Sequence, residues 1–197
     1  MRVPEASSVP ETSAGLTCAS LAADIIELVT LRDRTHVLRA LGARRGLSLP
    51  AFGRITSARD TLVLCVRPER WLLLTPPAAP GAALGNWQGA CTACAAAVEL
   101  SAGLTALHLT GPAVREVLAR GCRLDLHPDA FAAGSAAASH MAQVPVVLGA
   151  LPAGWLLLTP SSTARHLREW LTMAAAPFGL ESRGSVTVAT LSGEKSA

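Results

Sequence analysis

Two cysteines of this sequence have a spacing that suits a metal ion. Cys91 and Cys94 have the C-x2-C spacing of half a zinc site or of a redox pair. A structural zinc site needs two further ligands, and the nearest candidates, His108 and Cys122, belong to a different predicted unit. The pair lies in an alanine-rich segment predicted to be helical, where a free cysteine packs as a small apolar side chain. The residues therefore favour buried, inert thiols over a metal centre.

Asp125 and His127 have the side chains of an acid–base pair, and alternate residues of an extended segment point to the same side. No nucleophile or further acidic partner accompanies them as part of a catalytic pattern, so the pair alone does not indicate catalysis. Asp125 precedes Pro128, at a position where aspartate commonly accepts hydrogen bonds from the backbone amides of a turn. We therefore expect Asp125 to stabilise the loop, and His127 to anchor it or to contact another chain.

Longer patterns for catalysis or nucleotide binding are absent from the sequence. It contains no G-x-S-x-G nucleophile elbow, no G-x-G-x-x-G and no Walker sequence. The net charge is only +3, and the densest basic stretch, Arg39, Arg44 and Arg45, sits beside a predicted helix end, where cations complement the helix dipole. Without a basic stripe interleaved with aromatic residues, nucleic-acid binding has no support.

The composition indicates a protein that is covered in part by another protein. Half of the residues are hydrophobic and 16% are charged, whereas charged residues make up about a quarter of typical soluble domains. An uncharged run over residues 130–164 is interrupted by prolines, glycines and polar side chains, so no apolar helix of about 20 residues fits there. The first fifteen residues are polar and lack the pattern of a secretory leader. We expect a cytoplasmic protein with reduced cysteines, without a membrane segment.

One six-residue string, Trp-Leu-Leu-Leu-Thr-Pro, occurs twice, starting at Trp71 and at Trp155. A continuous apolar run is typical of a strand that is buried on both faces, so both tryptophans are predicted to be structural. Trp170 is predicted to be structural as well, on the inward face of a helix that ends near residue 175.

The residues around each string predict the same order of elements. The first set is a strand at 25–31, a helix at 34–44, a hairpin of 62–66 with 71–75, a helix near 80–93 and a strand at 97–100. The second is a strand at 105–109, a helix beginning at 111–112, a hairpin of 139–148 with 155–159, a helix near 161–175 and a strand at 185–191. This β-α-β-β-α-β order is ferredoxin-like. The sequence therefore predicts an α+β fold of two ferredoxin-like units, 21–102 and 103–193, packed as one compact body between tails at 1–20 and 194–197.

Three stretches resemble the gamma subunit family of heterotetrameric sarcosine oxidase. They are Val98-Glu99-Leu100-Ser101, the run from Leu107-His108-Leu109-Thr110-Gly111-Pro112 to Leu118, and Gly121-Cys122-Arg123-Leu124-Asp125-Leu126-His127-Pro128 with Phe131. They are similar to V-D-L-S, L-x-L-S-G-P-A-A and K-G-C-P-L-D-L-H-P-x-x-F in that family. Glu99 and Arg123 depart from it, standing where Asp and Pro are usual. The resemblance spans about residues 25–180.

The resemblance implies the fold of glycine-cleavage T-protein-like domains and a non-catalytic gamma subunit that supports assembly of a complex. That complex contains alpha, beta, gamma and delta subunits and oxidatively demethylates sarcosine to glycine with O2. The methyl group passes to tetrahydrofolate or leaves as formaldehyde, and hydrogen peroxide is the other product. FAD, FMN and NAD are expected on the large subunits and zinc on delta, with no cofactor on this chain. The gamma subunit is expected to pack on alpha. The motif residues are candidates for an interface: Gly111, Pro112, Gly121, Cys122, Leu124, Asp125, His127, Pro128 and Phe131.

Three alternatives remain open at this stage. T-protein relatives bind folate, so the chain could be a stand-alone tetrahydrofolate-binding enzyme or sensor, with Glu99 as the carboxylate for the pterin. Against this, the chain has about half the length of those relatives. It could instead be a zinc-binding module that uses Cys91 and Cys94. It could also be a subunit of a related complex that oxidises a different N-methyl amino acid.

Overall fold

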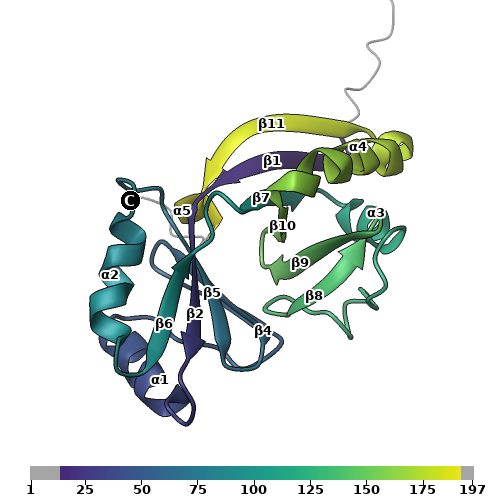
Figure 1. Ribbon diagram of the computed structural model, residues 1–197. Coiled ribbons are helices and arrows are strands. Elements are labelled where there is room, and N and C mark those ends of the chain that lie inside the picture. The colour runs from purple at the N-terminus through teal and green to yellow at the C-terminus, as the bar shows by residue number, and fades with distance from the viewer. Residues whose placement is uncertain (1–13, 192–197) are drawn as a thin grey trace, which may run out of the picture.

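Two β-sheets pack against each other in the computed structural model, which describes residues 14–191 (Figure 1). The six-stranded sheet has the order β11-β1-β7-β10-β9-β8. Its strands are β1 (Leu16–Ala22), β7 (Leu104–Thr110), β8 (Ala136–Met141), β9 (Val144–Leu151), β10 (Gly154–Pro160) and β11 (Leu180–Thr187). The five-stranded sheet has the order β3-β4-β5-β2-β6. Its strands are β2 (Asp24–Thr30), β3 (Arg54–Ala58), β4 (Thr61–Arg67), β5 (Arg70–Thr75) and β6 (Ala95–Glu99).

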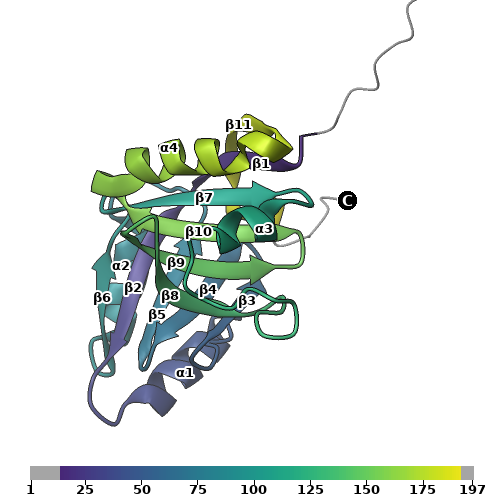
Figure 2. The ribbon, with the colours of Figure 1, turned by 90° about the vertical axis from the view of Figure 1, so that its right-hand side faces the viewer.

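Helices cover the outer face of each sheet, so the molecule has four layers. α1 (Thr35–Arg44) and α2 (Ala82–Cys91) pack on the five-stranded sheet. α3 (Val114–Ala119) and α4 (Ala164–Ala175) pack on the six-stranded sheet, as the turned view shows (Figure 2). Short helices complete the described part of the chain: η1 (Ser161–Thr163), η2 (Ala176–Phe178) and α5 (Val188–Leu191). None of the helices in residues 14–191 has both the length and the apolar character needed to cross a lipid bilayer.

The repeated string explains how three apolar cores form around two sheets. On β5, Trp71 and Leu73 point to the helices, whereas Leu72 and Leu74 point to the other sheet, because successive side chains of a strand alternate between its faces. The second string on β10 alternates in the same way, with Trp155 on the helix side. Burying one large apolar side chain contributes about 1.5–3 kcal/mol, so each string stabilises two layers at once.

Strand β1 corrects the predicted N-terminal tail. Residues 16–20, which the sequence assigned to a tail, belong to β1, which pairs with β7 and in parallel with β11. Residues 21 and 22, which the sequence assigned to the first unit, also belong to β1 and pair within the six-stranded sheet. Only Ala23 separates β1 from β2, so the chain passes directly from one sheet to the other (Figure 1). The tail was inferred from polar residues further upstream, whereas Leu16 is fully buried and belongs to the core beneath α3 and α4. The rest of the predicted N-terminal tail up to residue 13, and the predicted C-terminal tail, lie outside the described residues.

The strand prediction for the second half also needs correction. The segment 139–148 is not one strand, because β8 and β9 form a hairpin whose turn residues, Ala142 and Gln143, have φ angles of 50° and 68°. A two-residue type I′ hairpin turn requires positive φ at both central residues, and the usual Asn-Gly signal is missing here. The last strand is Leu180–Thr187, and residues 188–191 of the predicted strand are helical. Strands β3 and β8 give each sheet one strand that the predicted β-α-β-β-α-β order lacks. The coarse prediction of an α+β fold is confirmed.

Candidate functional site

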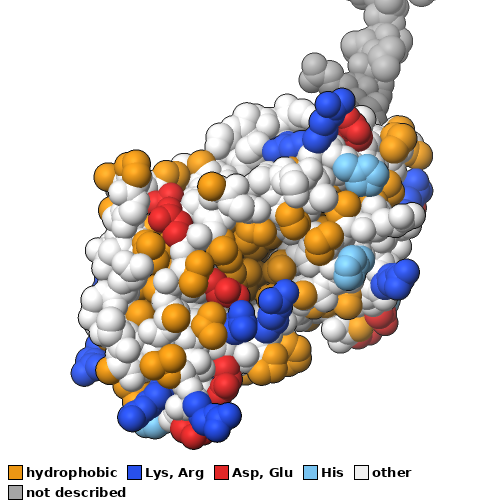
Figure 3. Space-filling view, viewed as in Figure 1, with side chains coloured by type: hydrophobic (Ala, Val, Ile, Leu, Met, Phe, Trp, Pro, Cys, Tyr) orange, Lys and Arg blue, Asp and Glu red, His pale blue; other side chains and the backbone are white. Residues whose placement is uncertain are grey.

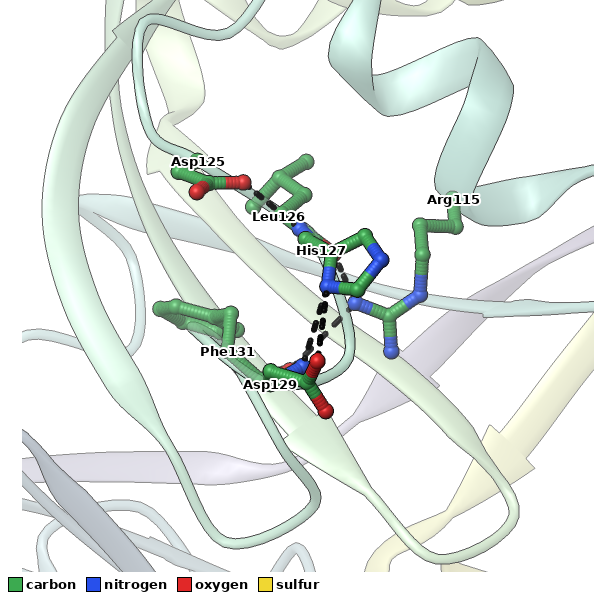
Figure 4. Close-up of polar contacts among 6 residues, drawn as sticks. All are labelled: Arg115, Asp125, Leu126, His127, Asp129 and Phe131. Atoms are coloured by element: carbon green, nitrogen blue, oxygen red, sulfur yellow. Dashed lines mark hydrogen bonds and ion pairs between the residues drawn. The ribbon is translucent and has the colours of Figure 1, made fainter.

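The loop over residues 121–131 is held in place by an arginine of α3. Arg115 donates hydrogen bonds from Nη1 to the carbonyl oxygens of Leu126 and Phe131, the latter at 3.3 Å (Figure 4). Its guanidinium carbon lies 4.9 Å from the centroid of the Trp155 ring. The Phe131 ring stacks on the same tryptophan, with centroids 5.6 Å apart and planes 9° from parallel. A cation–π contact of this kind contributes about 0.5–2 kcal/mol and holds Arg115 in place. The hydrogen bonds from Arg115 and the Phe131 stack then fix the loop from its inner side.

The outer side of this loop presents two carboxylates and an imidazole to solvent. The Asp125 Oδ1 atom accepts a hydrogen bond of 2.9 Å from the His127 amide, the turn hydrogen bond expected at this spacing. The Asp129 amide donates to His127 Nδ1 over 3.3 Å, and the Asp129 carboxylate lies 3.5 Å from the same nitrogen (Figure 4). The side chains of His127 and Asp129 are 65% and 94% exposed. Asp125 bonds the backbone and the His127 imidazole is open to water. The loop therefore does not shield Asp125 and His127 from solvent, as an active site generally shields its acid–base groups.

Two glycines of the motif allow close contacts between elements. A Cβ on Gly111, whose φ is +114°, would lie 2.5 Å from the Gly15 carbonyl oxygen at the start of β1. A Cβ on Gly121 would lie 2.3 Å from a ring carbon of Trp170 on α4. Real Cβ atoms do not approach other atoms so closely, so both positions exclude larger residues.

Other motif residues serve packing. Leu126 and Phe131 are buried in the core beneath α3 and α4, and Leu124 and Cys122 pack against that core. The Cys122 thiol lies 3.7 Å from the Ser139 hydroxyl. Pro112 precedes α3 rather than standing within it, because the helix begins at Val114.

The structure does not bring Cys91 and Cys94 together with further metal ligands. Both thiols are buried between α2 and the five-stranded sheet. Burial raises the pKa of the Cys91 thiol, and the neighbouring Cys94 adds to that effect. His108 and Cys122 belong to the half of the molecule built on the other sheet. Within residues 14–191, no cluster of three or more His, Cys, Asp or Glu side chains is arranged to hold a metal ion.

Glu99 is engaged in a contact at the end of β6. The Ser101 hydroxyl donates to the Glu99 carboxylate over 3.2 Å and accepts a hydrogen bond of 3.0 Å from the Ile25 amide. The half-buried carboxylate therefore fastens the corner that leads from β6 to β7.

The sequence gives no signal for an open groove between the two sheets. Two adjoining hollows of about 390 and 130 Å³ share four lining residues: Arg67, Leu104, Ala138 and Val147. These residues come from strands of both sheets and from positions far apart in the chain, so no local pattern could have predicted their proximity. We call the combined hollow the inter-sheet groove.

Comparison with known proteins decides the family. A model of the sarcosine oxidase, gamma subunit family matches residues 34–177. The chain belongs to this family. The resemblance read from the three motif stretches is therefore confirmed.

Individual members of the gamma subunit family align over most of their length. The sarcosine oxidase subunit gamma of Corynebacterium sp. (strain P-1) is 34% identical over 150 residues, which cover 72% of this chain and 71% of the relative. The subunit gamma of an Arthrobacter species is 33% identical over 147 residues, covering 71% of this chain and 70% of the relative.

Solved structures extend the family comparison to the fold. A chain of the heterotetrameric sarcosine oxidase from Corynebacterium sp. U-96, in complex with pyrrole 2-carboxylate, superposes with a TM-score of 0.73 and 29% identity. The match covers 92% of this chain and 88% of that chain. The glycine cleavage system aminomethyltransferase T of Bartonella henselae superposes with a TM-score of 0.64 and 15% identity, over 92% of this chain and 51% of that chain. This second likeness shows a shared fold.

Proposed function

We propose that this chain is the non-catalytic gamma subunit of a heterotetrameric sarcosine oxidase and supports assembly of that complex. The observation that carries the proposal is the match, over 92% of the chain, to a chain of a solved heterotetrameric sarcosine oxidase. Alignment with subunits that bear the gamma name supports the same conclusion.

A supporting role fits the geometry of the motif. The inward-facing motif residues pack or hold the loop, and the outward-facing ones, Asp125 and His127, are exposed on a rigid support. A preorganised, exposed loop suits protein contact because little conformational freedom is lost on binding. We infer that residues 121–131 contact a partner subunit, most directly alpha.

The remaining parts of the assembly follow from the family. We propose alpha, beta and delta subunits as partners and the cytoplasm as the location. The complex would demethylate sarcosine oxidatively to glycine with O2, with tetrahydrofolate as acceptor of the one-carbon unit. FAD, FMN, NAD and the folate site would belong to the larger subunits and zinc to delta, with none on this chain.

An internal duplication is also part of the proposal. We infer two related ferredoxin-like units, residues 21–102 and 103–193, each carrying one copy of the repeated string. The shared strand order supports this: β4-β5-β2-β6 in one sheet corresponds to β9-β10-β7 followed by β11 in the other, where β1 is inserted between β7 and β11. The strings occupy the equivalent central strands β5 and β10.

Purification of the tagged chain from its own host tests the assignment. The expected result is a stable complex with a flavin-containing alpha subunit, a beta subunit and a small delta subunit, which oxidises sarcosine. Recovery of the chain alone, with full amine-oxidising activity in the isolated chain, would reject it.

Calorimetric titration of the isolated chain with tetrahydrofolate should give no binding heat at high micromolar ligand, and clear binding would favour a folate enzyme or sensor instead.

A substitution in the loop tests the contact. His127→Ala should leave the unfolding temperature unchanged, because the side chain is 65% exposed, and should weaken binding of the remaining subunits. His36→Ala, on the exposed surface of α1, is the matched control. Equal assembly of the His127 variant and the wild type would remove this loop from the interface.

A further inference from the structure

The inter-sheet groove has apolar walls that this chain leaves uncovered. Figure 3 shows the hollow as a concentration of hydrophobic side chains between the two halves of the molecule. One wall is formed by Val66 and Leu72 of the five-stranded sheet, and the other by Ala138, Val147 and neighbouring residues of the six-stranded sheet. Ala138 is exposed and both valines are half-buried, so the apolar surface is open to solvent in the isolated chain.

Thr159 lines the hollow, but its hydroxyl lies on the helix side of β10 and is already bonded within the chain. The buried Thr159 hydroxyl donates to the Pro145 carbonyl oxygen over 3.1 Å and lies 3.1 Å from the Thr163 hydroxyl. The Thr163 hydroxyl in turn donates to the carbonyl oxygen of Pro160 over 3.1 Å. On this wall an occupant gains mainly apolar contact, with side chains such as Leu158 and Val147, and meets His140 as an exposed polar side chain.

The charges on the rim are not balanced. Arg70 pairs with Glu27 over 3.7 Å, so each of these two charges has a partner of opposite sign. Arg67, on the same hairpin, has no ion pair or hydrogen bond from its guanidinium to any residue in the described range 14–191. Water solvates this cation in the isolated chain, but a body that covered the groove would have to supply an anion for it.

We propose that the inter-sheet groove receives a segment of a neighbouring subunit, which places apolar side chains between the sheets and a carboxylate on Arg67. This inference rests on the proposed function and adds to it the surface and the chemistry of the partner. Charge complementarity argues for a different chain as the occupant. A symmetric pair of copies that met through their grooves would bring two Arg67 side chains together, because such an interface uses the same patch twice.

Assembly of the purified complex with groove variants tests the proposal. Arg67→Glu reverses the unpaired charge, and Ala138→Trp fills the hollow from an exposed position. Each should weaken binding of the remaining subunits on the order of tenfold or more. Reversing the Arg67 charge repels the proposed carboxylate, which slows association and speeds release, and the added indole at position 138 takes the space of the apolar side chains. Arg165→Glu on α4, where the side chain is 91% exposed, is the matched control and should bind as the wild type does. Circular dichroism melting of each isolated variant checks that the fold is intact.

A photo-reactive benzoylphenylalanine at position 140, where an exposed and already large histidine lines the same hollow, identifies the occupant. In the purified complex, irradiation should cross-link this position to a segment of another subunit that contains an aspartate or glutamate. Position 165 serves as the control site. Undiminished assembly of both groove variants, or a cross-link only to a second copy of this chain, would overturn the inference while leaving the proposed function intact. Failure of the wild-type chain to bind any other subunit would instead reject the proposed function.

Discussion

His108 on β7 is half-buried, and its buried Nε2 atom has no hydrogen-bond partner in the described structure. Burial lowers the pKa of this imidazole, and the backbone of Ala153 offsets part of that effect. The unfolded chain therefore takes up a proton more readily than the folded one. The free energy of unfolding should fall as the pH drops below about 6.5 and should be highest above it.

Urea denaturation between about pH 5 and 7.5 measures this dependence. His108→Gln removes the titrating group, so its free energy of unfolding should vary less with pH than that of the wild type. Identical pH profiles for His108→Gln and the wild type would show that this imidazole is not responsible.

The cysteines offer a second test at the residue scale. Burial raises the pKa values of Cys18, Cys65 and Cys91, which keeps these thiols protonated and unreactive at neutral pH. Cys122 is only partly buried. Ellman's reagent should therefore modify Cys122 first in the native protein and all five cysteines after unfolding in guanidinium. Rapid native modification of Cys91, or about one bound zinc per chain by elemental analysis, would instead support a functional pair with Cys94.

Close contact between the end of α3 and helix α4 depends on Gly121, two residues beyond the last residue of α3. A side chain at position 121 collides with the Trp170 ring, so Gly121→Ala should destabilise the protein by about 1–3 kcal/mol. Gly85→Ala is the control, because its added methyl group meets no atom within 4 Å. Combining Gly121→Ala with Trp170→Leu should recover part of the lost stability, since the smaller side chain frees space. Additive losses in the double variant, measured by thermal unfolding, would contradict this contact.

The central strands β5 and β10 each depend on one tryptophan. The Trp71 ring is 1% exposed and its Nε1 donates to the Pro50 carbonyl oxygen over 2.9 Å, while Trp155 lies between Arg115 and Phe131. Changing either to alanine should cost about 3–5 kcal/mol, a large part of the stability of a typical domain, and should reduce the yield of soluble protein. Val98→Ala, at a residue that is 44% exposed, is the control. A normal unfolding temperature for either tryptophan variant would contradict the role of these strands.

Elements with a strong local signal could be predicted from the sequence, and elements defined by distant partners could not. The helices α1, α2 and α4 and the two repeated strings follow from local apolar patterns, and the Asp125 turn follows from spacing alone. Strand β1 was missed in part because its partners are distant in sequence: β7 lies in the middle of the chain and β11 near the opposite end. The contact of Arg115 with Trp155, which fixes the candidate loop, is likewise set by packing between distant segments. Long-range contacts of this kind leave no periodic pattern in the sequence.

At the scale of the whole molecule, the two halves share a core. The cluster between the sheets combines residues such as Ile25, Leu64 and Leu74 from one sheet with Leu156 and Leu158 from the other. Strand β1 adds a second connection, because it precedes the five-stranded sheet in sequence but pairs within the six-stranded one. The proposed units are therefore not expected to behave as independent domains, since separating them exposes one full face of each sheet.

Expression of the two halves as separate fragments, residues 14–102 and 103–191, tests this dependence. Each fragment alone should lack a cooperative thermal transition, because the first keeps β1 without β7 and β11 and the second exposes the apolar face of β10. Co-expression should restore a complex that unfolds cooperatively, since the inter-sheet core is then rebuilt from both fragments. Circular dichroism melting and size-exclusion chromatography measure both outcomes. A cooperative transition in residues 103–191 alone would show that the six-stranded sheet can form without β1 and without the apolar layer of its neighbour.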